Sequence, residues 1–323
     1  MKRIIICCDG TWNNPEQKAV SNVVKVSRAL VPEVRGVPQV VFYDWGVGSE
    51  GGAEKFSGGI SGVGINKNIK DAYRFLVHNY ETGDEICFLG FSRGAYTARS
   101  TVGMIRNVGV LQKRFADLIP RAFAIYRQKA GPDVAAARHF RQEFSREVRI
   151  RFIGVWDTVG ALGIPVKILR DILTPGKYEF HDTSLSRIVE RAAQALAIDE
   201  RRVDFKPAMW QRCPAETVMA QYWFAGVHCD VGGGYEESGL ADIALLWMVD
   251  QAEAAGLGFD RDYLADIAEP DVLGKLHRSR RGLYWAKRAY LRPVGEFGAL
   301  EKVHETVRQR MEKSNYHPPN INI

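Results

Sequence analysis

The sequence predicts an α/β fold in which helices cover both faces of a mostly parallel sheet. Short apolar segments rich in Ile, Val and Phe alternate with helical patterns, and the strand segments are apolar almost throughout. The expected strands are Arg3–Cys8, Gln39–Tyr43, Glu85–Gly90, Val148–Trp156 and Gln221–Ala225. The expected helices include Ser21–Leu30, Asn66–Tyr80, Ala95–Val108 and Asp242–Ala255. In such sheets, ligand sites lie at the C-terminal ends of the strands.

Three segments interrupt this alternation. Residues 112–149 carry two helical patterns, Lys113–Lys129 and Pro132–Arg146, and we expect a helical cap insertion over the site. Residues 160–215 mix short helical pieces with Pro and Gly, and residues 256–323 form a basic C-terminal extension. A chain of 323 residues, 46% hydrophobic and 25% charged, is typical of a globular protein. We expect one domain, 1–323, with the extension packed on it.

The net charge of +6 is distributed unevenly. Residues 1–111 carry +3, residues 112–149 carry +5, residues 150–260 carry −6 and residues 261–323 carry +4. This pattern argues against a nucleic-acid-binding protein. The basic segment 112–149 indicates a contact with an anionic membrane surface or substrate, with solvated helix faces as the alternative. Nothing in the pattern predicts an oligomeric state.

The five cysteines form no CxxC pair, and the short apolar run after Arg3 does not resemble a signal peptide. We therefore expect reduced thiols in a cytoplasmic protein, and export by a dedicated secretion system stays open. Neither a metal nor an organic cofactor is expected.

The strongest motif is Gly90-Phe91-Ser92-Arg93-Gly94, which follows an apolar strand and precedes a helix. G-x-S-x-G in this setting is the nucleophile elbow of α/β-hydrolases. The tight turn places the serine hydroxyl at a helix N-terminus, where a developing negative charge is stabilised. The motif predicts an α/β-hydrolase-like fold with Ser92 as nucleophile.

A serine nucleophile needs a base and an orienting carboxylate. His228 follows the strand that ends near Ala225, and we predict that it is the base, with His181 as the second candidate. Asp157 ends an apolar strand and is the predicted acid, with Asp230 as its alternative. Because the −6 segment surrounds His228, we expect its carboxylates to favour the imidazolium.

The predicted oxyanion hole uses two backbone amides. The first belongs to Arg93, which follows the nucleophile, and the second to Gly10 or Thr11 at the end of the first strand. Asp9 is expected to hold this loop in place. A simple Asp-Gly turn is the alternative.

Two other patterns carry alternatives. Residues 46–51 match G-x-G-x-x-G, the pattern of a dinucleotide-binding loop. Such a loop opens a helix directly and its acidic residue ends the next strand, whereas here more glycines follow and Asp71 lies inside a helical pattern. A phosphate- or nucleotide-binding module using loop 46–64 is therefore the weaker hypothesis. The acidic residues Asp230, Glu236, Glu237 and Asp242 match no EF-hand spacing and predict a solvated acidic loop. A catalytically idle α/β-hydrolase used for protein contacts is the other alternative.

Four segments together resemble the DUF2235 family, whose best-known members are the Tle1-like phospholipase effectors of type VI secretion. They are Cys8–Asn13, Gly90–Ala95, Trp156–Val159 and Gly226–Tyr235, and Leu196–Arg202 and Leu240–Ala244 are also similar to the family. The resemblance implies an α/β-hydrolase fold, with Ser92 as nucleophile, Asp157 as acid and His228 as base. It also implies hydrolysis of carboxylic esters, with phospholipids among the candidate substrates. Secreted effectors of this kind carry large additional membrane-anchoring segments, whereas this chain ends soon after the segments that resemble the family. A housekeeping esterase is therefore expected as the alternative to a secreted effector.

Overall fold

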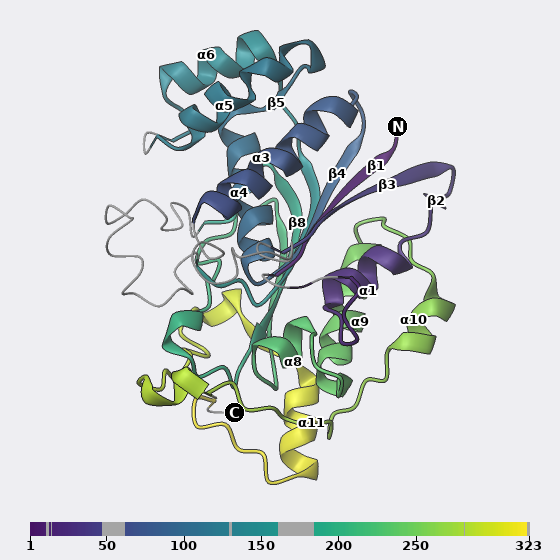
Figure 1. Ribbon diagram of the computed structural model, residues 1–323, viewed down its shortest axis with the longest axis vertical. Helices are drawn as coiled ribbons and strands as arrows, with labels where there is room; N and C mark the ends of the chain where they lie inside the picture. The colour runs from purple at the N-terminus through teal and green to yellow at the C-terminus, as the bar shows by residue number, and fades with distance from the viewer. Residues whose placement is uncertain are drawn as a thin grey trace.

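The computed structural model describes residues 1–10, 13, 15–46, 62–128, 131–160, 184–280 and 282–321. Its centre is an eight-stranded sheet in the order β10-β9-β8-β7-β4-β1-β3-β2. All neighbouring strands pair in parallel except β2, which is antiparallel to β3. Helices lie on both sides of this sheet (Figure 1). The predicted mostly parallel α/β architecture is therefore confirmed.

The five predicted strands are present with small shifts at their ends. They are β1 (Arg3–Cys8), β3 (Val37–Asp44), β4 (Glu85–Phe91), β7 (Ile150–Trp156) and β9 (Val218–Phe224). The short edge strands β2 (Glu33–Val34) and β10 (Lys302–Val303) complete the two sides. A central strand, β8 (Val189–Ala197), lies in the segment for which only short helical pieces were expected. That expectation is wrong. The segment is rich in alanine, which favours a helix locally, but it pairs with β7 and β9 and is buried between them.

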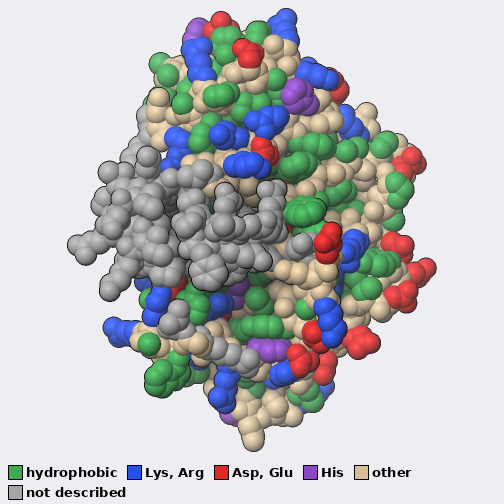
Figure 2. Space-filling model, in the orientation of Figure 1, with side chains coloured by type: hydrophobic (Ala, Val, Ile, Leu, Met, Phe, Trp, Pro, Cys, Tyr) green, Lys and Arg blue, Asp and Glu red, His purple; other side chains and the backbone are tan. Residues whose placement is uncertain are grey.

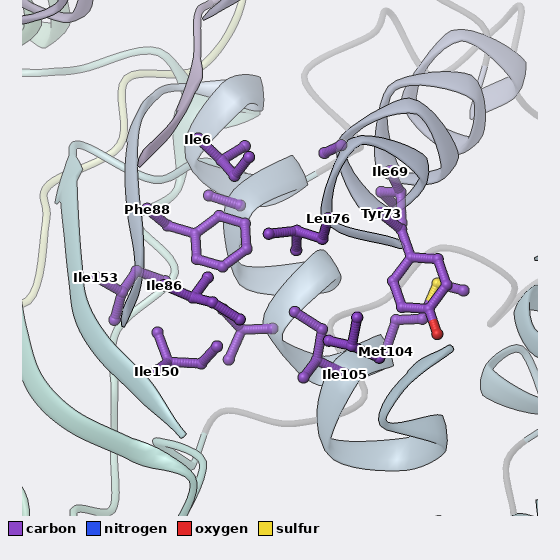
Figure 3. Packing of buried hydrophobic residues seen from close by; sticks show 14 of the residues in the cluster. Ile6, Ile69, Tyr73, Leu76, Ile86, Phe88, Met104, Ile105, Ile150 and Ile153 are labelled. Atoms are coloured by element: carbon purple, nitrogen blue, oxygen red, sulfur yellow. The ribbon is translucent and has the colours of Figure 1, made fainter. Parts of the chain in front are cut away.

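Alternate residues of β1 face opposite sides of the sheet, as the pleat requires. Ile4 and Ile6 join a core with α3 (Gly62–Asn79) and α4 (Arg93–Val108), and Figure 3 shows part of that core. Ile5 joins the opposite core, which includes residues of α1 (Asn22–Ala29), α9 (Gly239–Glu253) and α10 (Arg261–Ile267). Burial on both faces explains why these strands are apolar throughout.

The predicted helical insertion is present, but it does not cap the C-terminal edge of the sheet. It comprises η1 (Lys113–Leu118), α5 (Ile119–Tyr126) and α6 (Ala135–Phe144), framed by β5 (Val110–Leu111) and β6 (Ser145–Arg146). The insertion leaves the C-terminal end of α4 and returns to the start of β7. Because α4 crosses back between two parallel strands, that point is the N-terminal edge of the sheet. Figure 1 shows α5 and α6 at that end.

The C-terminal segment packs beside β8 and β9. β10 pairs with β9, and Val307 of α11 (Glu305–Lys313) is buried in a third core with Leu196 and Trp223. Short turns η2 (Val203–Phe205), η3 (Gly282–Ala286) and η4 (Gly298–Leu300) lie in the connections. No helix of the described ranges is long and apolar enough to cross a membrane.

Candidate active site

Ser92 lies in the sharp turn between β4 and α4. Its φ of 58° and ψ of −118° are rare for a residue with a side chain, and its amide donates to the carbonyl of Trp156 on the neighbouring strand. A Cβ atom at Gly94 would lie 2.1 Å from the carbonyl oxygen of Cys8, so only glycine lets α4 begin this close to β1. The contacts with β7 and β1 thus hold Ser92 in a strained backbone conformation.

His228 connects the Ser92 hydroxyl to a buried carboxylate. It begins α8 (His228–Gly232), after a three-residue loop that follows β9, and its Nε2 lies 2.8 Å from Ser92 Oγ. Its Nδ1 lies 2.5 Å from Oδ2 of Asp157, which follows β7 with a φ of 39°. Residues from the ends of three parallel strands therefore form one hydrogen-bonded chain, here called the Ser92–His228–Asp157 chain. The structure brings together the three residues to which the sequence assigned the chemistry.

Asp157 is fully buried and has three further donors. The Ala197 amide donates to Oδ1 over 2.9 Å, and the Arg292 guanidinium donates to both carboxylate oxygens. Burial by itself would raise the pKa of Asp157, but the charge of Arg292 and the hydrogen bond from His228 outweigh burial and hold that pKa below its ordinary value. Asp157 is therefore ionised and can orient the imidazole.

Arg292 is a site residue that the sequence analysis missed. It is 1% exposed, and its guanidinium also donates to the carbonyls of Ala197 (2.8 Å) and Phe205 (2.7 Å). It belongs to the basic run Lys275–Arg292, where no local motif separates it from its exposed neighbours. The sequence offered one signal. A buried carboxylate requires a positively charged partner, and no Lys or Arg lies next to Asp157 in the chain.

The surroundings of His228 favour its neutral imidazole. Burial lowers its pKa, and the opposing effects of Asp157 and Glu200 do not restore the ordinary value of 6.5. The rings of Phe91 and Phe205 lie 4.6 and 5.0 Å from it, centroid to centroid, and the residue is 4% exposed. The expected preference for the imidazolium is therefore wrong, because desolvation outweighs the nearby carboxylates. A neutral ring can accept the Ser92 proton at Nε2.

The loop after β1 lies against the nucleophile. A Cβ atom at Gly10 would lie 3.3 Å from Ser92 Cβ, but the Gly10 amide donates to Asp9 Oδ1 over 2.6 Å. This amide is therefore directed at Asp9 and not at the position predicted for the oxyanion. Asp9 also accepts from Asn13, Ser21 and Tyr43, so it ties the loop to α1 and β3. Thr11, the alternative donor, lies outside the described residues, as do His181 and residues 47–61 of the glycine-rich loop.

Asp230 does not contact His228. Its Oδ1 lies 2.6 Å from Nδ1 of His277, and its Oδ2 accepts from the amides of Val227 and His277. The other members of the predicted acidic loop each have a basic partner: Glu236 pairs with Lys18, Glu237 with Lys275 and Asp242 with Lys25. Within the described ranges, no three His, Cys, Asp or Glu side chains are grouped as a metal site would require.

Comparison with known proteins places this arrangement in a family. Residues 2–251 match the family described as "T6SS, Phospholipase effector Tle1-like, catalytic domain". The chain belongs to this family. The match to the Tle1-like domain includes Ser92, Asp157 and His228 and ends before Arg292.

Three other proteins resemble this Tle1-like chain. The uncharacterized protein YEL023C of Saccharomyces cerevisiae is 32% identical over 237 residues, which are 66% of this chain and 33% of the yeast protein. The chain thus spans about a third of that relative's length. An uncharacterized Pseudomonas aeruginosa protein of known structure has a TM-score of 0.46 at 18% identity, covering 80% of this chain and 46% of its own. The Tle1 effector bound to the VgrG spike of the type 6 secretion system has a TM-score of 0.41 at 20% identity, covering 73% and 52%.

Proposed function

We propose that this Tle1-like chain has an α/β-hydrolase-like fold and is a serine hydrolase of carboxylic esters, phospholipids among them. The single observation that carries the proposal is the Ser92–His228–Asp157 chain, at 2.8 and 2.5 Å, with the serine on a strained turn at a helix N-terminus. These are the relationships that a nucleophile, a general base and its orienting acid require. Membership of a family of phospholipase effector domains supports the same reaction class.

The proposed reaction passes through an acyl-enzyme. Ser92 Oγ attacks the ester carbonyl while Nε2 of His228 takes its proton, and Asp157 stabilises the imidazolium that forms. His228 then gives the proton to the departing alcohol. A water, activated by the same nitrogen, releases the acid and restores the serine. No step in this scheme calls for a metal or an organic cofactor.

The negative charge that develops on the carbonyl oxygen needs nearby donors. We assign one to the Arg93 amide at the start of α4, because the first amides of a helix point out of its end. Since the Gly10 amide is directed at Asp9, Thr11 is the stronger of the two candidates for the second donor.

A membrane contact through the basic insertion does not fit this site. α5 and α6 lie at the opposite edge of the sheet from Ser92 (Figure 1), so a lipid surface bound there would be held away from the nucleophile. Access to Ser92, which is 5% exposed, has to come from the C-terminal edge.

The test is a panel of p-nitrophenyl esters and phospholipids assayed with three proteins. We expect turnover by the wild type, and a loss of at least about 10⁴-fold in Ser92→Ala, because the nucleophile is removed. Ser27→Ala, a matched change on α1, should keep full activity. Turnover by Ser92→Ala at the wild-type rate would refute the proposal.

A further inference from the structure

A hollow lies beside α4 and begins one helical turn beyond the nucleophile. Its volume is about 470 Å³, and it runs along α4 from Tyr96 to Asn107. The far wall is formed by residues next to the start of β8 and by Trp210, and α5 closes one end with Tyr126. A volume of this size is within the range of small-molecule sites. None of the residues of the Ser92–His228–Asp157 chain lines it, so we call it the α4 pocket.

Four arginines line the α4 pocket, namely Arg99, Arg106, Arg127 and Arg187, and no Asp or Glu is among its described lining residues. Asp133 Oδ1 lies 3.3 Å from both Arg106 and Arg187. One carboxylate shared by these two guanidinium groups leaves the pair with an excess of positive charge. α5 and α6 form the upper end of the molecule in Figure 1, and Figure 2 shows Lys and Arg side chains gathered just below that end.

Two of these charges, Arg99 and Arg106, are partly desolvated. Arg99 is 7% exposed, and its guanidinium lies 4.8 Å from the Trp210 ring centroid and donates to Gln194 and Ala208. The pKa of Arg106 is lowered, first by burial and next by repulsion from Arg187. Guanidinium groups that repel one another around a hollow are stabilised when an anion enters it.

The charged donors of the α4 pocket are its four guanidinium groups. A guanidinium group can donate two parallel hydrogen bonds to a phosphate, and several such groups suit the several oxygens of that anion. A carboxylate would use fewer of these donors and neutralise less of the charge.

We propose that the α4 pocket binds a phosphate-bearing small molecule, either a free phosphate ester or the head group of a phospholipid. The pocket begins at Tyr96, and Arg99 lies roughly 10 Å along α4 from Ser92 at 1.5 Å per residue. By the same rise, Arg106 lies about 21 Å along α4 from Ser92, so the α4 pocket extends away from the nucleophile. Binding itself does not depend on ester hydrolysis, so it is tested separately from the proposed function.

The experiment uses the full chain carrying Ser92→Ala, so that no ligand is consumed. Glycerol 3-phosphate, monomeric dihexanoyl phosphatidylglycerol and, as the uncharged comparison, glycerol are titrated by calorimetry. We expect both phosphate compounds to bind and glycerol not to bind. Tighter binding of the phospholipid identifies a head group as the natural ligand, and tighter binding of glycerol 3-phosphate identifies a free phosphate ester.

The variant Arg106→Gln/Arg187→Gln should raise the Kd for the phosphate compounds about tenfold or more, because charge-assisted hydrogen bonds are lost. The matched control Arg138→Gln/Arg288→Gln removes the same charge from exposed positions outside the pocket and should leave the Kd unchanged. Arg187→Gln alone changes a side chain that is 62% exposed, so it provides the same comparison if the double variant unfolds. Absence of binding, or equal weakening by variant and control, would overturn the proposal.

Discussion

Arg292 donates to both carboxylate oxygens of Asp157, although the two residues lie 135 positions apart in the chain. Both side chains are fully buried, so the pair links the C-terminal segment to the end of β7 inside the fold. The guanidinium keeps Asp157 ionised in a position where burial would otherwise favour the neutral acid. The segment after residue 251, which the family match does not cover, therefore supplies part of the candidate site.

Arg292→Met should destabilise the fold by about 3–5 kcal/mol, the usual cost of leaving a buried charge without its partner. The same change should lower activity, because the pKa of Asp157 rises once its strongest cation is removed. Thermal unfolding and kcat on a p-nitrophenyl ester measure the two effects. Arg288→Met alters an exposed residue of the same run and is the control. Equal stability of the two variants would contradict this role for Arg292.

Asp157→Asn should lower kcat by about 10⁴-fold, as the equivalent change does in serine proteases, because the amide favours the wrong imidazole tautomer. Asp230→Asn should have a much smaller effect on kcat, since Asp230 pairs with His277 and not with His228. Steady-state kinetics on one ester compare the two. A loss in Asp230→Asn as large as in Asp157→Asn would show that the orienting acid has been misassigned.

Activity should rise with pH and reach its half-maximal value below pH 6.5. The base must be neutral, and burial lowers the pKa of His228 below 6.5. For the same reason the contribution of His228 to folding stability is complete above pH 6.5 and decreases as the pH falls, because the unfolded state then binds the proton more readily. The pH profile of kcat/KM reports the free enzyme. A midpoint above 6.5 would mean that the carboxylates outweigh desolvation.

Gly94→Ala should destabilise the protein by about 1–3 kcal/mol or more, because its new methyl group would overlap the carbonyl oxygens of Cys8 and Asp9. Gly103→Ala is the control in the same helix. Its Cβ would meet Tyr126 at 3.4 Å, an ordinary contact, and alanine favours the helix by up to about 1 kcal/mol. Denaturant unfolding of both variants tests the prediction. Comparable losses would show that the close approach of α4 to β1 can relax.

Local patterns were sufficient to predict most of the sheet. β1 is apolar on both faces and was predicted with its observed bounds. β8 was missed because its four alanines, from Ala192 to Ala197, favour a helix locally, whereas burial between two strands makes it a strand. The position of α5 and α6 was also missed, because it follows from the direction in which α4 crosses the sheet and not from their own residues.

The candidate site was predictable where each residue follows a strand. Ser92 comes directly after β4, Asp157 comes directly after β7, and His228 follows the short loop after β9. Parallel strands bring such positions together at one edge of the sheet. Arg292 follows no strand, and its partner lies far away in the chain. Its role depends on tertiary packing, as does the pairing of His277 with Asp230.

The most direct test of the account is labelling with a fluorophosphonate, which reacts only with an activated serine. The account predicts one label per wild-type chain, located by mass spectrometry on Ser92, with none in Ser92→Ala and little in His228→Ala. The Ser27→Ala control should label as the wild type does. A folded wild-type protein that takes up no label, or that carries it elsewhere and keeps it in Ser92→Ala, would contradict the assignment of Ser92 as the nucleophile.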